Sequence, residues 1–326
     1  MSVGYAINQW KPGMAQFVRV EEHERAFKTI AACGFDEVEL RAGTFRWEPL
    51  GRPERIVQYY GSIEAFVDVL GACGLQRVSS FFFDPGEPII EELSFGRDPA
   101  DPADRDAIVA SLRPFAAFLQ RVGGSTLVVR PAGSYWRTGA LGDEQLDELA
   151  ATWNAVGSMA GELGIHVALH VDCLSAIQTA DEIASLLDRA DETVGLALDT
   201  GELTIAGIDP VQLFERHASR VAHVHLSDVR AVDTLGERTT PNAELGFLSA
   251  GGERGVERWF WELGTDGGHV DVPALLDAIA RHGYRGTVVV ESDQSPDPAG
   301  SVMLNSWYLQ RHAPTLMSDP PMRSLE

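Results

Sequence analysis

Residues 194–228 read VGLALDTGELTIAGIDPVQLFERHASRVAHVHLSD, and this stretch decides the fold. It holds two short apolar runs, VGLALDT from 194 and VAHVHLS from 221. Between them, apolar residues at 209–219 recur three and four positions apart, which is typical of a helix packed on one face. A buried strand, a helix and a second buried strand predict parallel strands joined by a crossover helix. Both runs end in polar side chains.

The same unit recurs along the chain. Six further apolar runs predict strands: VGYAIN from 3, DEVELR from 36, QRVSSFFF from 76, STLVVRP from 125, IHVALHV from 165 and GTVVVES from 286. Helices are expected at 21–33, 62–73, 105–122, 143–163, 179–190, 209–219, 271–282 and 301–312. Eight repeats, without a GxGxxG after the first strand, predict an α/β protein with a single (β/α)8 TIM barrel over residues 1–326.

Two local features interrupt the repeat. Pro114 is expected to bend the helix at 105–122, since proline removes a backbone donor and clashes with the preceding turn. A long loop insertion at about 230–269 carries Trp-Phe-Trp at 259–261. It lacks the length and apolar content for a core of its own, so we expect a lid or a partner-binding loop.

Composition excludes several classes of protein. The chain has 26 Lys and Arg against 48 Asp and Glu, a net charge of −22, which disfavours nucleic acid as a partner. The start, MSVGYAINQW, lacks the pattern of a signal peptide, and no apolar run is long enough to span a membrane. A cytoplasmic location is therefore expected. Cys33, Cys73 and Cys173 lack CxxC spacing and predict buried free thiols.

Polar side chains end four consecutive strands in the second half. They are His170, Asp199, His225 and Glu291. Because the carboxyl ends of barrel strands carry the active site, these side chains are expected to converge as two imidazoles and two carboxylates. Such a set suits a divalent ion, with manganese expected and cobalt, zinc or magnesium as alternatives. Each residue also has an ordinary role open to it: Asp199 can cap the next turn, and Glu291 can pair with an arginine.

Residues 196–230 also carry a family resemblance. Together with the stretch HVDCLSAIQT from 170, they resemble the xylose isomerase-like barrels known as sugar phosphate isomerases/epimerases, above all the inosose dehydratase branch with its DTGH, HVHLKDV and VVE signatures. The resemblance implies that Asp199, His225 and Glu291 are metal ligands. It places His170 where many relatives have a ligand glutamate.

Within this group, GYAINQW from 4 and SSFFFDPG from 79 are similar to the large subunit of bacterial C-glycoside deglycosidases. Those enzymes act on 3-oxo C-glycosides, remove a proton next to the ketone and expel the aglycone, together with a small β-rich partner subunit. This resemblance implies a keto-sugar or glycoside substrate and a hetero-oligomer.

The sequence departs from the family at two positions. Glu202 replaces the histidine of DTGH, and His170 replaces a glutamate. Epimerases of this superfamily use two carboxylates as acid and base, so elimination or one-sided proton transfer fits this chain better than epimerisation.

Removing a proton next to a carbonyl needs a base and a means of stabilising the developing charge. Candidate bases are Asp172, Glu202 and Glu39; His223 and Arg230 are candidate stabilisers. Glu39 is equally open to solvation or pairing with Arg41, and Asp228 is expected to orient His225. Substrate-binding candidates are Arg130, for which a salt bridge at the barrel rim is the alternative, and the aromatic residues Phe82, Trp136, Trp259 and Trp261.

The favoured function is therefore a metal-dependent lyase that cleaves the C-glycosidic bond of 3-oxo C-glycosides. The alternatives are an inosose (2-keto-myo-inositol) dehydratase or a ketose isomerase/epimerase, and, more remotely, a non-catalytic scaffold subunit. An endonuclease of the same superfamily would need more metal ligands and a basic groove.

Overall fold

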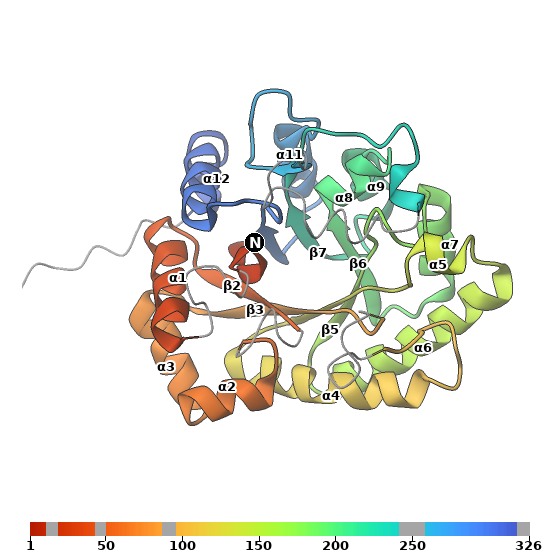
Figure 1. Cartoon of the computed structure of the whole chain (residues 1–326), viewed down its shortest axis with the longest axis horizontal. Coiled ribbons are helices and arrows are strands. Elements are labelled where there is room, and N and C mark those ends of the chain that lie inside the picture. The colour runs from red at the N-terminus through yellow and green to blue at the C-terminus, as the bar shows by residue number, and fades with distance from the viewer. Residues whose placement is uncertain (11–18, 43–49, 87–95, 241–257, 318–326) are drawn as a thin grey trace, which may run out of the picture.

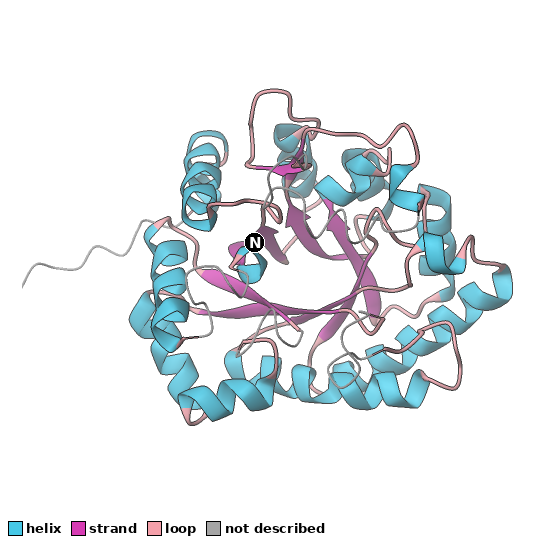
Figure 2. Cartoon of the chain, viewed as in Figure 1, coloured by secondary structure: helices cyan, strands magenta, loops and turns pink. Residues whose placement is uncertain are grey.

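Eight parallel strands close into a barrel surrounded by helices (Figures 1 and 2). The computed structural model describes residues 1–10, 19–42, 50–86, 96–240 and 258–317. Around the barrel the strands follow the order β1-β10-β7-β6-β5-β4-β3-β2, and β2 pairs with β1. They are β1 Ser2–Ala6, β2 Glu37–Arg41, β3 Arg77–Phe83, β4 Thr126–Val129, β5 His166–His170, β6 Val194–Asp199, β7 Val221–Leu226 and β10 Thr287–Val290. The predicted TIM barrel is confirmed.

Each strand is buried on both sides. Outward-facing apolar side chains pack against the helices in one large core, which includes Phe66, Phe118 and Trp153. Inside the barrel a small separate cluster of Phe82, Val128, Ala168 and Ala197 fills the space. Above these two alanines stand His170 and Asp199, because alternate residues of a strand face the same side.

The helices agree with the predicted positions to within a few residues, and the described ranges contain three further short helices, α2, α5 and α8. Their bounds are α1 Val20–Ala32, α2 Pro53–Tyr60, α3 Ile63–Cys73, α4 Arg105–Val122, α5 Tyr135–Thr138, α6 Asp143–Gly161, α7 Ala180–Arg189, α8 Thr200–Ile205, α9 Pro210–His217, α11 Val272–Arg281 and α12 Pro298–His312. Short 3-10 turns lie at Ile7–Gln9, Glu237–Thr239 and Pro314–Leu316.

Capping residues explain several helix ends. Thr179 accepts a hydrogen bond from the backbone of Glu182, and the Glu182 side chain accepts one from the backbone of Thr179. Gly74 ends α3 at φ 97°, a left-handed conformation that glycine adopts without strain. Helix α4 continues through Pro114.

The long insertion contains a feature that the sequence did not suggest. A two-stranded antiparallel ribbon joins β8 Asp228–Val229 to β9 Phe260–Trp261. Phe260 packs with Cys173, Ile205 and Val229 in a small cluster over the ends of the second-half strands. Residues 241–257 of the predicted insertion lie outside the described residues.

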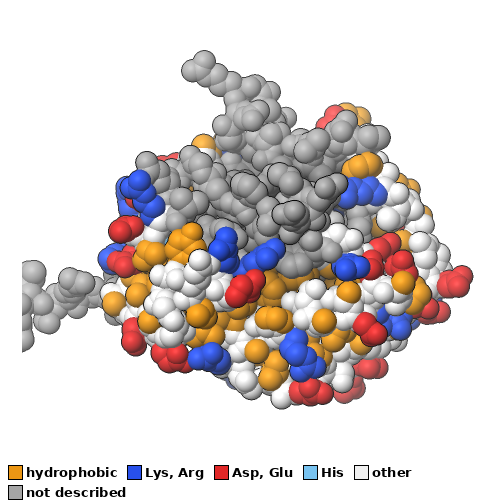
Figure 3. Space-filling view, turned by 60° about the horizontal axis from the view of Figure 1, so that its bottom comes forward, with side chains coloured by type: hydrophobic (Ala, Val, Ile, Leu, Met, Phe, Trp, Pro, Cys, Tyr) orange, Lys and Arg blue, Asp and Glu red, His pale blue; other side chains and the backbone are white. Residues whose placement is uncertain are grey.

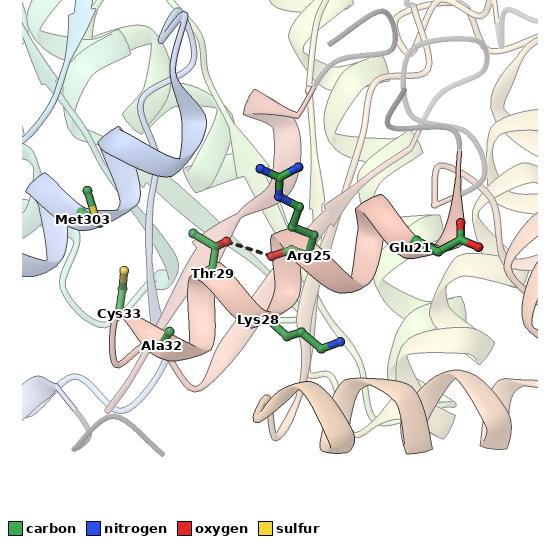
Figure 4. Close-up of a pocket in the computed structure, with 7 residues that line it drawn as sticks. All are labelled: Glu21, Arg25, Lys28, Thr29, Ala32, Cys33 and Met303. Carbon is green, nitrogen blue, oxygen red and sulfur yellow. Dashed lines mark hydrogen bonds between the residues drawn. The ribbon is translucent and has the colours of Figure 1, made fainter. Parts of the chain in front are cut away.

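Helices α1 and α12, which are far apart in the sequence, are neighbours on the outside of the barrel. A shallow groove runs between them (Figure 4). On α12 the side chains of Met303, Leu304 and Trp307 are exposed. The groove is lined by Glu21, Arg25, Lys28, Thr29, Ala32, Cys33 and Met303. It lies on the helical exterior, away from the strand ends.

Charged side chains of both signs are interspersed on the face shown in Figure 3, with apolar side chains between them. Among the described helices, none has the length and hydropathy needed to cross a membrane. All three cysteines are free; Cys73 and Cys173 are buried and Cys33 is half-buried.

Candidate metal centre and its surroundings

Strand register brings the predicted ligands together. Asp199 and His225 are paired neighbours on β6 and β7, and His170 ends the adjacent strand β5. Asp199 Oδ2 lies 3.1 Å from His170 Nε2 and 3.6 Å from His225 Nδ1. His225 Nδ1 also lies 3.6 Å from Glu291 Oε1. All four side chains are at least nine-tenths buried. We call His170, Asp199, His225 and Glu291 the His225 cluster.

Asp199 caps the next turn, which is the ordinary role that the sequence left open to it, and only one of its two carboxylate oxygens is used for this. Its Oδ1 accepts hydrogen bonds from the backbone N–H of Glu202, at 3.0 Å, and from Ser227 Oγ, at 3.2 Å. It thereby caps α8 and fixes the carboxylate plane. The other oxygen, Oδ2, remains directed at the two imidazoles.

Glu291 is held from the other side. Asn8, just beyond β1, donates from Nδ2 to Glu291 Oε2 at 2.8 Å and also contacts Asp293. Glu291 Oε1 is left facing His225.

Glu39 and His223 lie on the barrel interior beside His225. Glu39 Oε1 is 2.9 Å from His225 Nε2, and Glu39 Oε2 is 3.0 Å from His223 Nε2. Ser80, its register neighbour on β3, donates to Glu39 Oε2 at 2.7 Å. Glu39 and His223 are almost completely buried, and the Glu39 carboxylate lies where it can orient His225. Glu39, His223 and His225 also have the spacing of a group that could hold a metal ion.

The expectation that Asp228 orients His225 is wrong. The Asp228 carboxylate instead accepts hydrogen bonds from the backbone N–H groups of Val229, Gly264 and Val270. It therefore ties the β8–β9 ribbon to the following loop, and Glu39 occupies the place beside His225 Nε2.

Three buried carboxylates surround one imidazole, and their pKa values reflect the excess of negative charge. Despite its burial, the pKa of His225 is raised well above its usual range by Glu39 and Glu291. Burial and the neighbouring Asp293 and Asp199 raise the pKa of Glu291. The His170 and His225 imidazoles hold the pKa of Asp199 well below its usual range against the effect of burial. These opposing shifts reflect the excess of carboxylates over positive charge in and around the His225 cluster.

The cluster fits a divalent cation. Both ring nitrogens of His225 and Nδ1 of His170 are buried and form no hydrogen bond within the described part of the chain. The carboxylates nearby are close but lack the alignment that a hydrogen bond requires. Donors bound about 2.0–2.2 Å from one ion lie roughly 3.0–3.5 Å apart, close to the 3.1 and 3.6 Å found here. His170, Asp199 and His225 satisfy the spacing expected of a metal site, and Glu291 adjoins them.

Glu202, the residue in place of the family histidine, adjoins this cluster. Its Oε2 accepts a hydrogen bond from the backbone N–H of Cys173 at 2.9 Å. Burial, with repulsion from Asp199 and Asp172, raises the pKa of Glu202 to about 8. The carboxyl therefore holds a proton at neutral pH in the absence of other cations.

A second group of charged side chains lies at the ends of β3, β4 and β5. Arg130 donates from Nε to Asp172 Oδ2 at 2.5 Å and from Nη2 to Asp172 Oδ1 at 3.0 Å. It also donates to Asp84 and to Ser134, each at 3.3 Å. This Arg130 cluster of Arg130, Asp84, Asp172 and Ser134 is the salt bridge that the sequence offered as the alternative. It also occupies Asp172, a candidate base.

The aromatic and cationic candidates lie at different places relative to the His225 cluster. Phe82 contacts His170 edge to face at 5.1 Å between ring centres and so borders the His225 cluster. Trp136 lies on α5 after β4, with its Nε1 buried and without a hydrogen-bond partner among the residues described. Trp261 packs between Arg230 and Arg258, each 4.6 Å from its ring centre, and Trp259 packs on the Phe260 cluster. These contacts place Arg230 on the ribbon, where it supports Trp261.

Three residues around the cluster were missed from the sequence. They are Asn8, Ser80 and Ser227, which donate to Glu291, Glu39 and Asp199 respectively. Ser80 and Ser227 lie in or directly after strands beside the predicted ligands, so their position offered a signal. Asn8 offered a signal only through its place after the first strand.

The comparisons with known proteins fit this geometry. Residues 27–307 match the family described as xylose isomerase-like TIM barrel. The chain is 38% identical over 138 residues to the rhizopine catabolism protein MocC of Rhizobium meliloti, covering 42% of this chain and 40% of the relative. It is 34% identical over 157 residues to an inosose dehydratase of Bacillus cereus (strain AH820), covering 47% and 49%. These matches span less than half of each relative.

Among solved structures, the zinc-bound IOLI protein superposes with a TM-score of 0.68 at 12% identity, covering 98% of this chain and all (100%) of that one. This likeness concerns the fold. The match over residues 27–307 covers most of the described barrel strands and all four members of the His225 cluster. The chain therefore belongs to the family of xylose isomerase-like TIM barrels.

Proposed function

We propose that the chain is a divalent-metal-dependent lyase that acts on a cyclic keto-sugar or keto-cyclitol. In the proposed reaction a proton leaves the carbon next to the ketone, its bonding electrons form a carbon–carbon double bond, and the substituent on the next carbon departs with its own bonding pair. For a hydroxyl leaving group, protonation releases water, as in a dehydration of 2-keto-myo-inositol.

The arrangement of the His225 cluster carries this proposal. Four ligand atoms of adjacent strands, His170 Nε2, Asp199 Oδ2, His225 Nδ1 and Glu291 Oε1, form a chain of 3.1–3.6 Å contacts at the end of the barrel where TIM-barrel enzymes act. Buried imidazole nitrogens without hydrogen bonds are costly unless a ligand or ion engages them. A divalent ion held there supplies Lewis acidity toward a ketone and its neighbouring hydroxyl.

The relatives support a cyclitol substrate. One is named an inosose dehydratase and another a rhizopine catabolism protein, and both matches cover less than half of the relative. Zinc in a protein of the same fold supports testing zinc beside manganese, cobalt and magnesium. The expected location remains the cytoplasm.

Glu202 is the side chain of this chain best suited to move the proton. One carboxyl oxygen, Oε2, is fixed by the Cys173 backbone, which leaves Oε1 for the substrate. Its pKa of about 8 in the absence of a cation includes repulsion from Asp199. That pKa falls once positive charge lies beside Asp199, so Glu202 can exchange a proton near neutral pH.

The other candidates take supporting roles in this proposal. The neighbouring His225 and His223 hold the pKa of Glu39 well below its usual range although burial opposes this, so Glu39 stays ionised and orients His225. Both carboxylate oxygens of Asp172 accept hydrogen bonds from Arg130, so Asp172 is less available to a substrate than Glu202.

Cleavage of a 3-oxo C-glycoside is the second candidate. Phe82 against His170, with Trp136 on the neighbouring rim, favours a flat aromatic leaving group. In this reaction the same proton abstraction breaks the carbon–carbon bond to the aglycone, which departs with the bonding pair and takes up a proton. A small β-rich partner subunit is expected.

The test is a turnover assay of the Mn²⁺-, Co²⁺- or Zn²⁺-loaded protein with 2-keto-myo-inositol and with a 3-oxo C-glycoside. NMR in D2O follows exchange at the carbon next to the ketone as well as product formation. We expect exchange and elimination with one ketone, and loss of both in Glu202→Gln. Absence of exchange and elimination with both ketones would contradict the proposal and favour a scaffold subunit.

A further inference from the structure

Asn8 is a buried amide whose hydrogen bonds are incomplete. It is 5% exposed, and its Nδ2 donates to Glu291 Oε2 at 2.8 Å and contacts Asp293 Oδ1. This pairing fixes the amide orientation, because a flipped amide would set Oδ1 against two carboxyl groups. The other atom, Oδ1, is buried and has no hydrogen-bond partner in the described ranges of the chain.

Another buried asparagine shows what a structural amide looks like here. Asn305 is fully buried, and its Nδ2 donates to Tyr5 Oη at 3.2 Å and to Ser292 Oγ at 3.1 Å. Its Oδ1 accepts from the backbone N–H of Leu263 at 2.8 Å. Every polar atom of Asn305 is used within the fold, whereas Asn8 keeps one acceptor unused.

Asn8 lies close to the His225 cluster. The residue follows β1 in the 3-10 turn Ile7–Gln9, at the same barrel end as the His225 cluster. Glu291 lies between the two: its Oε1 faces His225 and its Oε2 receives Asn8. Asn8 therefore adjoins a candidate ligand on the side opposite His225.

We propose that Asn8 Oδ1 accepts a hydrogen bond from one hydroxyl of the substrate, on the β1 side of the His225 cluster. Asn8 thus links ligand geometry to substrate choice: Nδ2 orients Glu291, and Oδ1 selects a ring that presents a hydroxyl beside the reacting carbons. This inference rests on the proposed function, since it assumes a polyhydroxylated ring.

The experiment measures dissociation constants of non-reacting ring polyols on the Mn²⁺-saturated protein. The probes are myo-inositol and its monodeoxy derivatives, followed by methyl β-glucopyranoside and its monodeoxy derivatives. In the wild type we expect one deoxy derivative to bind at least about tenfold more weakly than its parent, since it leaves Oδ1 unpaired. In Asn8→Leu and Asn8→Ala, that ratio should fall to about one to two.

A matched control is Asn154→Leu. Asn154 lies on α6, where its Oδ1 accepts from the backbone of Asp191 at 2.8 Å, so this variant should keep the wild-type ratio. Two measurements on each Asn8 variant distinguish the roles of the two amide atoms. Mn²⁺ titration reports the loss of Nδ2, which should weaken Mn²⁺ binding, and the deoxy ratio at saturating Mn²⁺ reports the loss of Oδ1. Two substitutions of Asn8 are used so that the test remains possible if one variant does not fold.

Equal ratios in the wild type and both Asn8 variants would overturn the inference. Failure of both polyol series to bind the wild type would also overturn it, whereas the proposed function stands or falls on the separate turnover of the two ketones.

Discussion

The His225 cluster and the Arg130 cluster lie at the same end of one barrel, and both are built from buried charged side chains. In the Arg130 cluster, guanidinium donors point at carboxylate and hydroxyl oxygens over 2.5–3.3 Å. In the His225 cluster, His170 Nε2 is hydrogen-bonded to Asp199, but both ring nitrogens of His225 lie 2.9–3.6 Å from the carboxylates of Glu39, Asp199 and Glu291 without forming hydrogen bonds. In the first cluster one guanidinium donates to two carboxylates, whereas in the second a cation fits beside imidazole nitrogens that form no hydrogen bond. Incomplete hydrogen bonding, more than charge, therefore marks the candidate site.

The sharpest way to break this comparison is to remove Asp199, whose Oδ2 contacts both His170 and His225. Asp199→Ala should weaken Mn²⁺ binding by more than about 100-fold, since a direct ligand matters more than its supports. Thermal unfolding with and without Mn²⁺ measures this, because an ion that binds only the folded state stabilises it by about 2.7 kcal/mol at 100 times its Kd. A wild-type-like shift of Tm in the variant would refute the role of Asp199.

Glu39→Gln tests the support of His225 and should have the next largest effect. The substitution replaces the buried carboxylate 2.9 Å from His225 Nε2 with a neutral amide of the same shape. We expect Mn²⁺ affinity to fall by about 10- to 100-fold, the usual cost of losing a carboxylate behind a ligand histidine. Isothermal titration provides the value. Unchanged affinity would show that the cluster does not need Glu39.

Glu202→Gln should separate proton transfer from metal binding. We expect Mn²⁺ affinity to stay within about threefold and kcat to fall by about 100-fold or more. The metal-free protein offers a second readout. Because the pKa of Glu202 is raised to about 8 from 4.5, the folded state holds a proton that the unfolded state has lost, and stability falls as pH rises across this window.

Urea unfolding of the metal-free Glu202→Gln protein should therefore show a weaker loss of stability between pH 5 and pH 8 than the wild type. A parallel pH profile in both proteins would argue against a protonated Glu202.

Arg130→Met should leave metal binding nearly unchanged and reduce stability instead. It strands the carboxylates of Asp172 and Asp84, and breaking a buried ion pair costs about 3–5 kcal/mol. Urea unfolding measures the loss, and Asp172→Asn, which retains an acceptor oxygen, should cost less. A large fall in Mn²⁺ affinity would mean that the two clusters are one functional unit.

Much of the fold was predictable because each strand is buried on both faces and each helix shows an apolar stripe. The four members of the His225 cluster were predictable for the same reason: a residue that ends a barrel strand has a known place. Asp199 and His225 are even register neighbours.

The direction in which a side chain points, and the partner it pairs with, could not be predicted from its position in the sequence. Glu39 and Asp228 are both acidic and both near a strand end, but only Glu39 faces the barrel interior toward His225. Likewise Asp172 ends a strand as the ligands do, yet Arg130 lies within hydrogen-bond distance of it. The β8–β9 ribbon could not be predicted because its strands are two residues long and lie far apart in the chain.

Elemental analysis of the purified wild type and of His225→Ala, with Arg130→Met as a control, tests the metal centre most directly. We predict about one manganese, cobalt or zinc ion per chain in the wild type and in Arg130→Met, and a loss of that ion in His225→Ala. Wild-type protein that contains no divalent ion, and binds none when Mn²⁺, Co²⁺ or Zn²⁺ is added, would contradict it.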